Sequence, residues 1–413
     1  MIASLRRVIS AIRLAAGDFV RRLRRPTVVY YPRFQSAADL ANHYHRARWY
    51  LPYRRGACEH VVLYAPKEFD DHIPGPPPYM GVHGDVEPHV CVHAGGAGLV
   101  FDLLTARAVL LWKPRPSRLL MLALRLTGAR VARVATDDPA SREFGVYPAL
   151  LWRSLCPTRA REQILSENRD RFVALAQRLR GRGWRRACVF GTGPSLERAA
   201  DFDFSETLCV VCNSIVQNDA LLDRLRPAFI CAGDSISHFG VSAYAHRFRL
   251  DLVRQLENRD IYLVTTADFG HLFLAHFPAL TEKVFLIGQD STDPVYDLAE
   301  HYGLPRLDST LNIHMLPLAA TFAREIQLLG CDGKSARRDN EDFWAHAAGA
   351  QYRGAVESGH QCHPTFDAHR QRSTYDRYIR SIERTIAGGE RRGYTYVCLS
   401  ESAIPVLNAR MKR

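Results

Sequence analysis

The sequence lacks the features that would place this chain among membrane-spanning, disulfide-rich or zinc-stabilised proteins. It has no long apolar run free of charge and no cleavable signal-peptide pattern. His83, His89 and His93 have no cysteine partners at zinc-ligand spacing. The ten cysteines are scattered, several of them inside apolar, strand-like runs. We therefore expect reduced, buried thiols in a cytoplasmic protein, and no structural metal.

Neither charge nor hydrophobicity is extreme, which argues against wholesale disorder. Of the 413 residues, 47% are hydrophobic and 24% are charged, an ordinary globular balance. A chain of this length exceeds what one hydrophobic core usually serves, so we expect two domains.

Acidic residues are almost absent from residues 1–26, where Asp18 stands alone. The same stretch has apolar residues at helical spacing and seven arginines, Arg6, Arg7, Arg13, Arg21, Arg22, Arg24 and Arg25. It is too charged to span a bilayer, but its pattern suits a helix lying on an anionic membrane surface. A helix docked on its own domain is the alternative. Nucleic-acid binding ranks lower because neither aromatic–basic interleaving nor zinc-ligand spacing accompanies the arginines.

Short β-branched or aromatic runs alternate with helical patterns along the rest of the chain, which is typical of parallel sheets covered by helices. In the first half the expected strands are 27–31, 60–64, 90–93, 109–112 and 131–135. In the second half they are 186–190, 208–212, 228–232, 262–265, 284–287, 326–329 and 394–399. We predict an α/β protein with two Rossmann-like domains, 27–160 and 185–413, joined by a linker helix at 161–184 and preceded by the basic helix 1–26.

A glycine turn follows the first strand of the second domain, but it is not a dinucleotide fingerprint. Residues 189–197 read VFGTGPSLE, and Leu196 stands where the third glycine of Gly-x-Gly-x-x-Gly belongs. Gly191 and Gly193 allow a sharp turn and a close approach to a ligand, and Ser195 can cap the helix that follows. Amides at a helix start favour an anion. The turn therefore predicts contact with a ligand phosphate.

Two further strands end in small or polar residues, at Asn213-Ser214 and at Gly233-Asp234-Ser235. In an open parallel sheet, ligands bind outside the carboxyl ends of the strands. We therefore expect these two loops and the glycine turn to converge.

The order of these motifs carries a family resemblance. FGTGPSL, then CNS after the next strand, then Ser309-Thr310 opening a helix, then a histidine-bearing segment and YVCLS near the end are similar in order to the bacterial sialyltransferases of glycosyltransferase family 42. A two-domain chain with an aspartate in the third loop resembles still more the retaining β-Kdo transferases of family 99. The resemblance covers roughly residues 185–405. It implies a GT-B-like arrangement with a sialyltransferase-like second domain, and a CMP-activated keto-sugar acid as donor without a catalytic metal or other cofactor.

Carried over by position, the resemblance implies a set of donor-binding residues. The donor phosphate region would be met by Gly191, Thr192, Gly193 and Ser195, the nucleotide or sugar by Asn213, and the sugar carboxylate by Ser309 and Thr310. Ser235 and His271 are expected to line the same crevice. The sequence departs from family 42 at Thr192 and Leu311 and has no matching tyrosine near Lys334, which favours a keto acid other than sialic acid.

Displacing CMP from an anomeric carbon builds positive charge on the sugar and negative charge on the leaving phosphate. Lys334 and His363 are candidates to stabilise the phosphate, with His369 in reserve. Asp234 stands where a nucleophile belongs in a retaining reaction. Glu162, in the linker helix, is a further candidate acid, although a glutamate on such a helix ordinarily lies on its solvated face.

Other functions stay open on the sequence. An inverting reaction would instead use a histidine of the 358–369 stretch as general base. A pterin pyrophosphokinase-like enzyme would need ATP and magnesium, and a basic membrane or nucleic-acid adaptor would need no chemistry. The family resemblance implies a surface-glycan acceptor, such as lipopolysaccharide O-antigen or capsule, held by the first domain. We expect no nucleic-acid partner. The acceptor and the basic N-terminal residues 1–25 together imply a peripheral location on the inner face of a bacterial inner membrane.

Overall fold

The chain forms two compact units in the computed structural model, Met1–Thr158 and Arg159–Arg413. The structure describes residues 25–72, 89–94, 97–113, 117–134, 143–235, 237–307, 309–334, 345–356, 358 and 372–412. The boundary lies two residues before the predicted end of the first domain. The predicted helix 1–26 therefore falls, except for its last two residues, outside the described residues.

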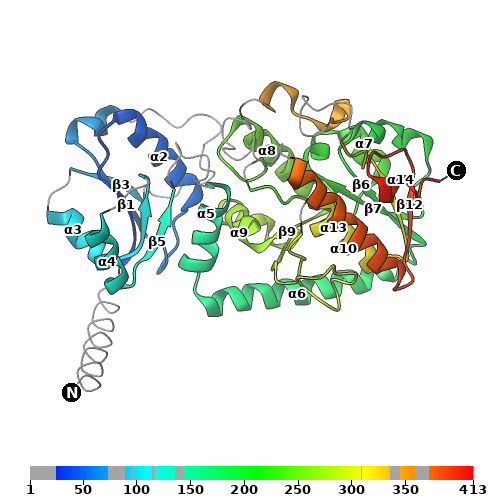
Figure 1. The fold of residues 1–413 in the computed structure, drawn as a ribbon, viewed down its shortest axis with the longest axis horizontal. Helices are drawn as coiled ribbons and strands as arrows, with labels where there is room; N and C mark the ends of the chain where they lie inside the picture. The colour runs from blue at the N-terminus through cyan, green and yellow to red at the C-terminus, as the bar shows by residue number, and fades with distance from the viewer. Residues whose placement is uncertain are drawn as a thin grey trace, which may run out of the picture. The chain divides into compact units, whose positions relative to one another are not determined.

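The first unit is built on a five-stranded parallel sheet in the order β3-β2-β1-β4-β5 (Figure 1). Its strands are β1 (Arg25–Tyr31), β2 (His60–Tyr64), β3 (Val90–His93), β4 (Ala106–Leu111) and β5 (Arg130–Arg133). Its helices are α2 (Ala37–Tyr50), η1 (Lys67–His72), α3 (Ala97–Thr105), α4 (Arg118–Thr127), α5 (Glu143–Ala149) and η3 (Leu150–Leu155). Because side chains alternate along a strand, the two faces of β1 pack differently. Val29 packs among residues of α3 and α4, whereas Tyr30 contacts His43 of α2.

The second unit is built on a seven-stranded parallel sheet in the order β10-β9-β8-β7-β6-β11-β12. Its strands are β6 (Arg186–Phe190), β7 (Thr207–Cys212), β8 (Phe229–Cys231), β9 (Tyr262–Thr266), β10 (Val284–Ile287), β11 (Glu325–Leu329) and β12 (Thr395–Cys398). The chain runs outward from β6 to β10 and then returns to the other side of β6, so the sheet is doubly wound. The prediction of two parallel α/β sheets is confirmed, and each predicted strand corresponds to one of β1–β12.

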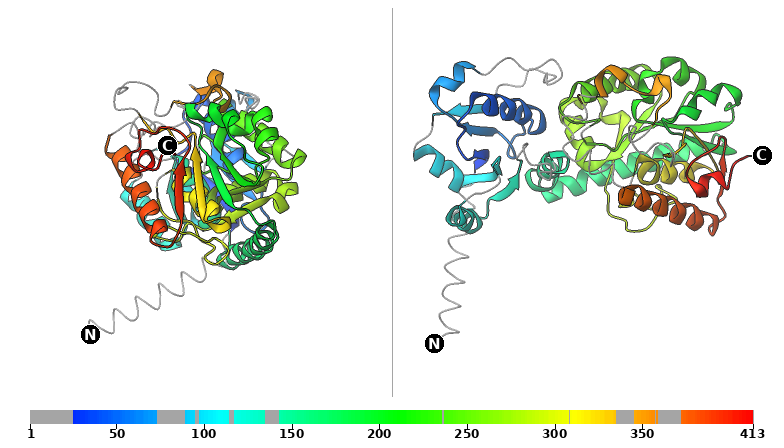
Figure 2. Two further views of the ribbon diagram at one scale, coloured as in Figure 1. Left: turned by 90° about the vertical axis from the view of Figure 1, so that its right-hand side faces the viewer. Right: turned by 45° about the horizontal axis from the view of Figure 1, so that its top comes forward.

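Helices cover both faces of this second sheet. The helices from residue 158 onward are α6 (Thr158–Arg180), η4 (Pro194–Asp201), η5 (Asn213–Gln217), α7 (Asp219–Leu225), α8 (Ala243–Asn258), α9 (Ala267–His276), η6 (Pro278–Lys283), η7 (Leu311–Met315), α10 (Leu316–Phe322), η8 (Ala348–Ala350), η9 (Arg353–Ala355), α13 (Arg372–Glu390) and α14 (Pro405–Asn408). Figure 2 (left) shows α13, in orange, on one side of the sheet and the green helices that follow β7 and β8 on the other. Residues of α6, η7, α10 and α13 share one continuous core with the strands.

The helix expected as a linker is part of this core. α6 buries Phe172, Leu175, Ala176 and Leu179 against the second sheet. The Asn168 side chain also accepts a hydrogen bond from the backbone N–H of Leu286, at 2.9 Å. α6 is thus a structural helix of the second unit. Among the residues that the structure describes, no helix is both long and apolar enough to cross a bilayer.

The nine described cysteines are all free, and all but Cys91 are buried. Burial raises the pKa of Cys209 and Cys212, each to about 12. These thiols are therefore protonated, unreactive packing groups.

Candidate functional site

Several of the predicted site residues lie together at the carboxyl edge of the second sheet. Strand register places Phe190 beside Val211 and Cys212 beside Cys231. The residues that follow, at the ends of β6, β7 and β8, therefore leave the sheet at nearly the same level. Neighbouring strands are about 4.8 Å apart, so these three loops are adjacent, as the sequence predicts.

The glycine turn is packed against the protein's own backbone. The amide of Gly191 donates to Leu329 O at 2.8 Å, and the amide of Gly193 donates to Gly330 O at 2.9 Å. A Cβ at Gly191 would lie 2.3 Å from Gly330 O, and one at Gly193 would lie 2.1 Å from the Asp332 carboxylate. The glycines are thus required because the loop after β11 approaches the turn closely, and they do not lie open to a ligand.

Ser195 is occupied within the same contact. Its hydroxyl donates to Asp332 Oδ2 at 2.9 Å, and its backbone N–H points at both carboxylate oxygens at 3.3 Å. It also lies within hydrogen-bond distance of the Gly330 amide and the Ser400 hydroxyl. An internal carboxylate therefore fills the position where the sequence predicts a ligand phosphate. The carbonyl of Thr192 likewise accepts the backbone N–H of Ala347 at 2.9 Å.

The partner of this turn is a partly desolvated acid. Burial raises the pKa of Asp332, and the hydrogen bonds from Ser195 partly oppose that rise. The helix that follows the turn, η4, is a 3-10 helix whose N-cap is Gly193, without a side-chain cap. Ser195 is the second residue of this helix rather than its N-cap, so the expected Ser195 cap is absent.

Asn213, Ser309 and Thr310 do come together. Thr310 Oγ1 lies 3.4 Å from Asn213 Oδ1, although the two residues are 97 positions apart. Asn213 has φ 51° and Ser309 has φ 73°, a left-handed backbone that non-glycine residues rarely adopt. Such strain costs roughly 1–3 kcal/mol and clusters at functional sites. These two strained positions, one on each side of a single contact, make this the strongest candidate for a ligand contact.

Asp234 lies next along the same edge, in the loop after β8. Its Oδ1 accepts the backbone N–H of Ser237 at 2.6 Å. Its backbone N–H donates to His238 Nδ1 at 3.1 Å. These bonds fix the carboxylate at the strand end, where it is partly exposed. Ser235, which follows it, is buried.

A buried histidine that the sequence did not single out supports this loop. His314, in η7, has no exposed surface, and its ring lies so close beneath Gly233 that a Cβ there would approach within 2.6 Å. Neither ring nitrogen of His314 makes a hydrogen bond to a described residue. Burial, together with His238, lowers the pKa of His314 to about 3. Burial likewise lowers the pKa of His238 to about 4, against the pull of Asp234. Both rings are therefore neutral at pH 7.

The two histidines predict that acid weakens the second unit. In the unfolded chain both histidines have the ordinary pKa of 6.5. Below that pH the unfolded state therefore binds protons that the folded state does not bind. We expect the free energy of unfolding to fall as the pH drops from about 6.5 toward 4, by up to about 1.4 kcal/mol per pH unit for each histidine. Urea unfolding of wild type and His314→Leu across this range measures it. An equally steep pH dependence in the variant would rule out His314 as a source.

Tyr244 of α8 borders the same region and was also missed. Its hydroxyl donates to Gln351 Oε1 at 2.9 Å. Burial raises its pKa to about 12, with smaller effects of Ser214, which lowers the pKa, and Asp234, which raises it. A phenol so held is a neutral hydrogen-bonding group at pH 7.

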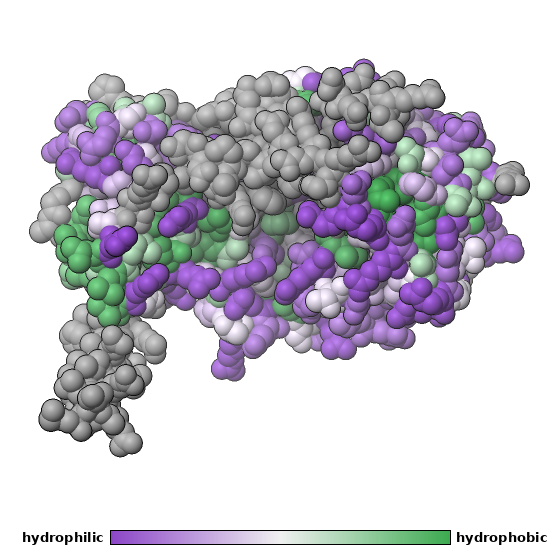
Figure 3. All heavy atoms as spheres, in the orientation of Figure 1, coloured by the Kyte–Doolittle hydropathy of each residue, from purple (hydrophilic) through white to green (hydrophobic). Residues whose placement is uncertain are grey.

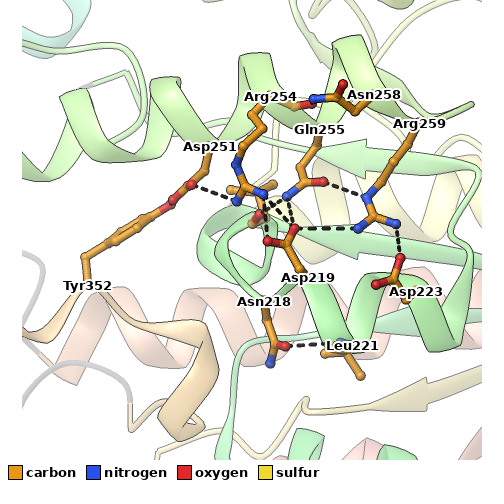
Figure 4. A network of polar contacts seen from close by, with 11 residues as sticks. Asn218, Asp219, Leu221, Asp223, Asp251, Arg254, Gln255, Asn258, Arg259 and Tyr352 are labelled. Carbon is orange, nitrogen blue, oxygen red and sulfur yellow. Dashed lines mark hydrogen bonds and ion pairs between the residues drawn. The ribbon is translucent and has the colours of Figure 1, made fainter.

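A polar network holds the residue next to Gln351. Tyr352 Oη donates to Asp251 at 2.7 Å, and Asp251 pairs with Arg254 at 2.9 Å (Figure 4). Arg254 and Gln255 both bond Asp219, which ties α8 to α7. The network therefore positions the segment that faces Tyr244.

The remaining predicted residues are spread more widely. Lys334 follows β11, and its backbone N–H donates to Tyr375 Oη at 2.9 Å. Since β11 is three strands from β8, the ends of these two strands lie roughly 14 Å apart. His271 is buried in α9, and Glu162 is exposed on α6. His363 and His369 lie outside the described residues.

Comparison of the chain with protein-family models, with characterised proteins and with solved structures gave no match. No group of three or more His, Cys, Asp or Glu side chains is placed to hold a metal ion within the part of the chain that the structure describes.

Proposed function

We propose that this protein is a glycosyltransferase that moves a 2-keto sugar acid from its CMP-activated form to a glycan acceptor, and that this sugar acid is Kdo. The observation that supports it best is the Asn213–Thr310 contact, with the strained backbone of Asn213 and Ser309, beside Asp234 at the carboxyl edge of a doubly wound sheet. Ligands of such sheets bind at this edge. The acceptor glycan on the first unit and a peripheral membrane location belong to the same proposal.

In this proposal Asp234 is the nucleophile of a retaining reaction. One carboxylate oxygen attacks the anomeric carbon of the sugar, the bond from that carbon to the phosphate oxygen breaks, and CMP leaves. The acceptor hydroxyl then attacks the same carbon, breaks the ester to Asp234 and loses its proton to a base. The Ser237 amide already bonds Oδ1, which orients the carboxylate before the substrate arrives.

The packing of the glycine turn changes where the donor is expected. Asp332 would repel a phosphate placed beside Ser195, so we propose that the donor lies toward β7 and β8. Asn213 and Thr310 would hold the nucleotide or sugar. Since Lys334 follows a strand three positions removed from β8, it is better suited to the nucleotide end than to the reacting carbon.

Replacing Asn213 by glycine removes the side-chain contact with Thr310 but keeps the left-handed backbone at position 213. Glycine adopts φ 51° without a steric penalty, so the variant should be at least as stable as wild type while lacking the amide. We expect the dissociation constant for CMP to rise about tenfold, which is the loss of one good hydrogen bond. Calorimetric titration with CMP, and with ATP as the competing nucleotide, measures it.

Arg226→Gly is the matched control, since Arg226 also has a left-handed backbone, at φ 44°, but caps α7. It should leave CMP affinity unchanged. Unaltered CMP binding by Asn213→Gly would contradict the proposed contact, and tighter binding of ATP than of CMP by wild type would favour the pyrophosphokinase alternative.

A further inference from the structure

The outward faces of α3 and α4 carry an apolar surface that the folding of the first unit does not use. We call this set the α3–α4 face: Val100, Phe101, Leu104, Leu119, Leu122 and Leu126. Leu119 is 80% exposed, Val100 60% and Leu126 59%. These six are most of the large apolar side chains that lie exposed among the described residues. Figure 3 shows the apolar area where α3 and α4 reach the surface.

The same helices bury a different set of side chains against the sheet. Leu103 and Leu124 belong to the core of the first unit, and Leu99, Leu120 and Met121 pack beside it. Leu119, Leu122 and Leu126 follow one another at spacings of three and four, so they form one stripe on the opposite side of α4. A helix that is apolar on both sides has a second apolar partner.

Positive charge surrounds the α3–α4 face. The Arg25 guanidinium stacks on the Phe101 ring, 4.9 Å from its centroid, and Arg118, Arg125 and Arg130 are exposed on or near α4. Residues 97–134 contain seven arginines and lysines and a single acid, Asp102. That acid accepts a hydrogen bond from Tyr64 Oη at 2.6 Å.

We propose that the α3–α4 face docks this protein on an anionic lipid bilayer, with its leucines and Phe101 entering the interface and the arginines contacting lipid phosphates. Basic residues around an apolar stripe are the composition that binds such surfaces. Residues 1–24 join the described chain at Arg25, beside Phe101, and add six more arginines against Asp18. A second copy of this face, or residues 1–24 laid over it, would bring like charges together. This docking would supply the peripheral membrane location included in the proposed function, and it does not depend on the transfer reaction.

The test is co-sedimentation of the full chain with vesicles of phosphatidylcholine, with and without phosphatidylglycerol. We expect binding to the anionic vesicles only, weakened by salt. The triple variant Leu119→Gln, Leu122→Gln, Leu126→Gln should bind at least about tenfold more weakly. Leu250→Gln, at a 47% exposed leucine on α8, is the matched control and should bind like wild type.

Circular dichroism and thermal melting show whether the triple variant is folded; if it is not, Leu119→Gln alone should still weaken binding measurably. Wild-type affinity in the folded variant would overturn the proposal, and residues 1–24 would then carry any binding. A change from oligomer to monomer caused by the triple variant without lipid would also overturn it, in favour of a second copy as the partner.

Discussion

Replacing Asp234 by asparagine is expected to lower the rate of sugar transfer by at least about a thousandfold, the scale of losing a catalytic nucleophile. The substitution removes the charge that attacks the anomeric carbon. It keeps Oδ1, which can still accept the Ser237 amide as the carboxylate does. The loop should therefore stay folded, and the loss should appear in kcat rather than in stability. Transfer from the CMP-sugar to a synthetic acceptor, followed by chromatography, measures it.

Asp332→Asn is the informative comparison, because Asp332 is an acid at the same edge of the sheet that already bonds Ser195. We expect Asp332→Asn to retain most transfer activity, while its free energy of unfolding differs from that of wild type. If Asp234→Asn keeps wild-type activity, Asp234 is only a turn residue, and its bonds to Ser237 and His238 are its whole role. If both variants lose activity equally without unfolding, the donor phosphate lies nearer the glycine turn than we propose.

Gly191→Ala should destabilise the second unit by at least about 3 kcal/mol, at the upper end for overpacking a core. The new Cβ would lie 2.3 Å from Gly330 O and 2.8 Å from its carbonyl carbon. Neither atom belongs to a side chain that can rotate away, and Gly330 itself has φ 73°. Relief therefore requires β6 and β11 to separate at their carboxyl ends. Urea unfolding of the variant, compared with wild type, measures the change.

Gly354→Ala serves as the control for the glycine substitution. A Cβ at Gly354 would meet no atom within 4 Å, so we expect a change within about 0.5 kcal/mol. Near-wild-type stability of Gly191→Ala would mean that the turn opens easily, and it would restore the glycine turn as a place for a ligand.

The strands were predictable because their signal is local. Runs such as Leu208–Cys212 and Val284–Ile287 are apolar throughout, which buried strands of a parallel sheet require. The alternation of such runs with helices then implies that the carboxyl ends share one edge, and this predicts Asn213 and Asp234 near each other.

The contacts of the site were less predictable because they join distant residues. Ser195 and Asp332 are 137 positions apart. Nothing near Ser195 in the sequence indicates that the anion beside it is the carboxylate of an aspartate in the same chain instead of a ligand phosphate. His314 lies beneath Gly233, yet its helical position alone marks it as an ordinary core residue. Tyr244 likewise bonds Gln351, 107 positions away, which no local pattern near Tyr244 indicates. The pattern of α6 predicts only a linker helix, because a single sequence does not show which sheet an amphipathic helix packs against.

The sequence alone likewise does not show which leucines of α4 are exposed. The run Arg118–Thr127 predicts a helix, but its apolar residues occupy both sides. Only the fold separates Leu124, which is buried, from Leu119, which is exposed.

The most direct test of the proposed function is the intact mass of the protein after incubation with CMP-Kdo, a synthetic glycan acceptor and EDTA, in wild type and in Asp234→Asn. We predict a Kdo adduct on wild type that maps to Asp234, product of retained anomeric configuration, and neither in the variant. No consumption of any CMP-sugar by wild-type protein would contradict the account. Product of inverted configuration, formed without an adduct, would leave the transferase standing and remove Asp234 as its nucleophile.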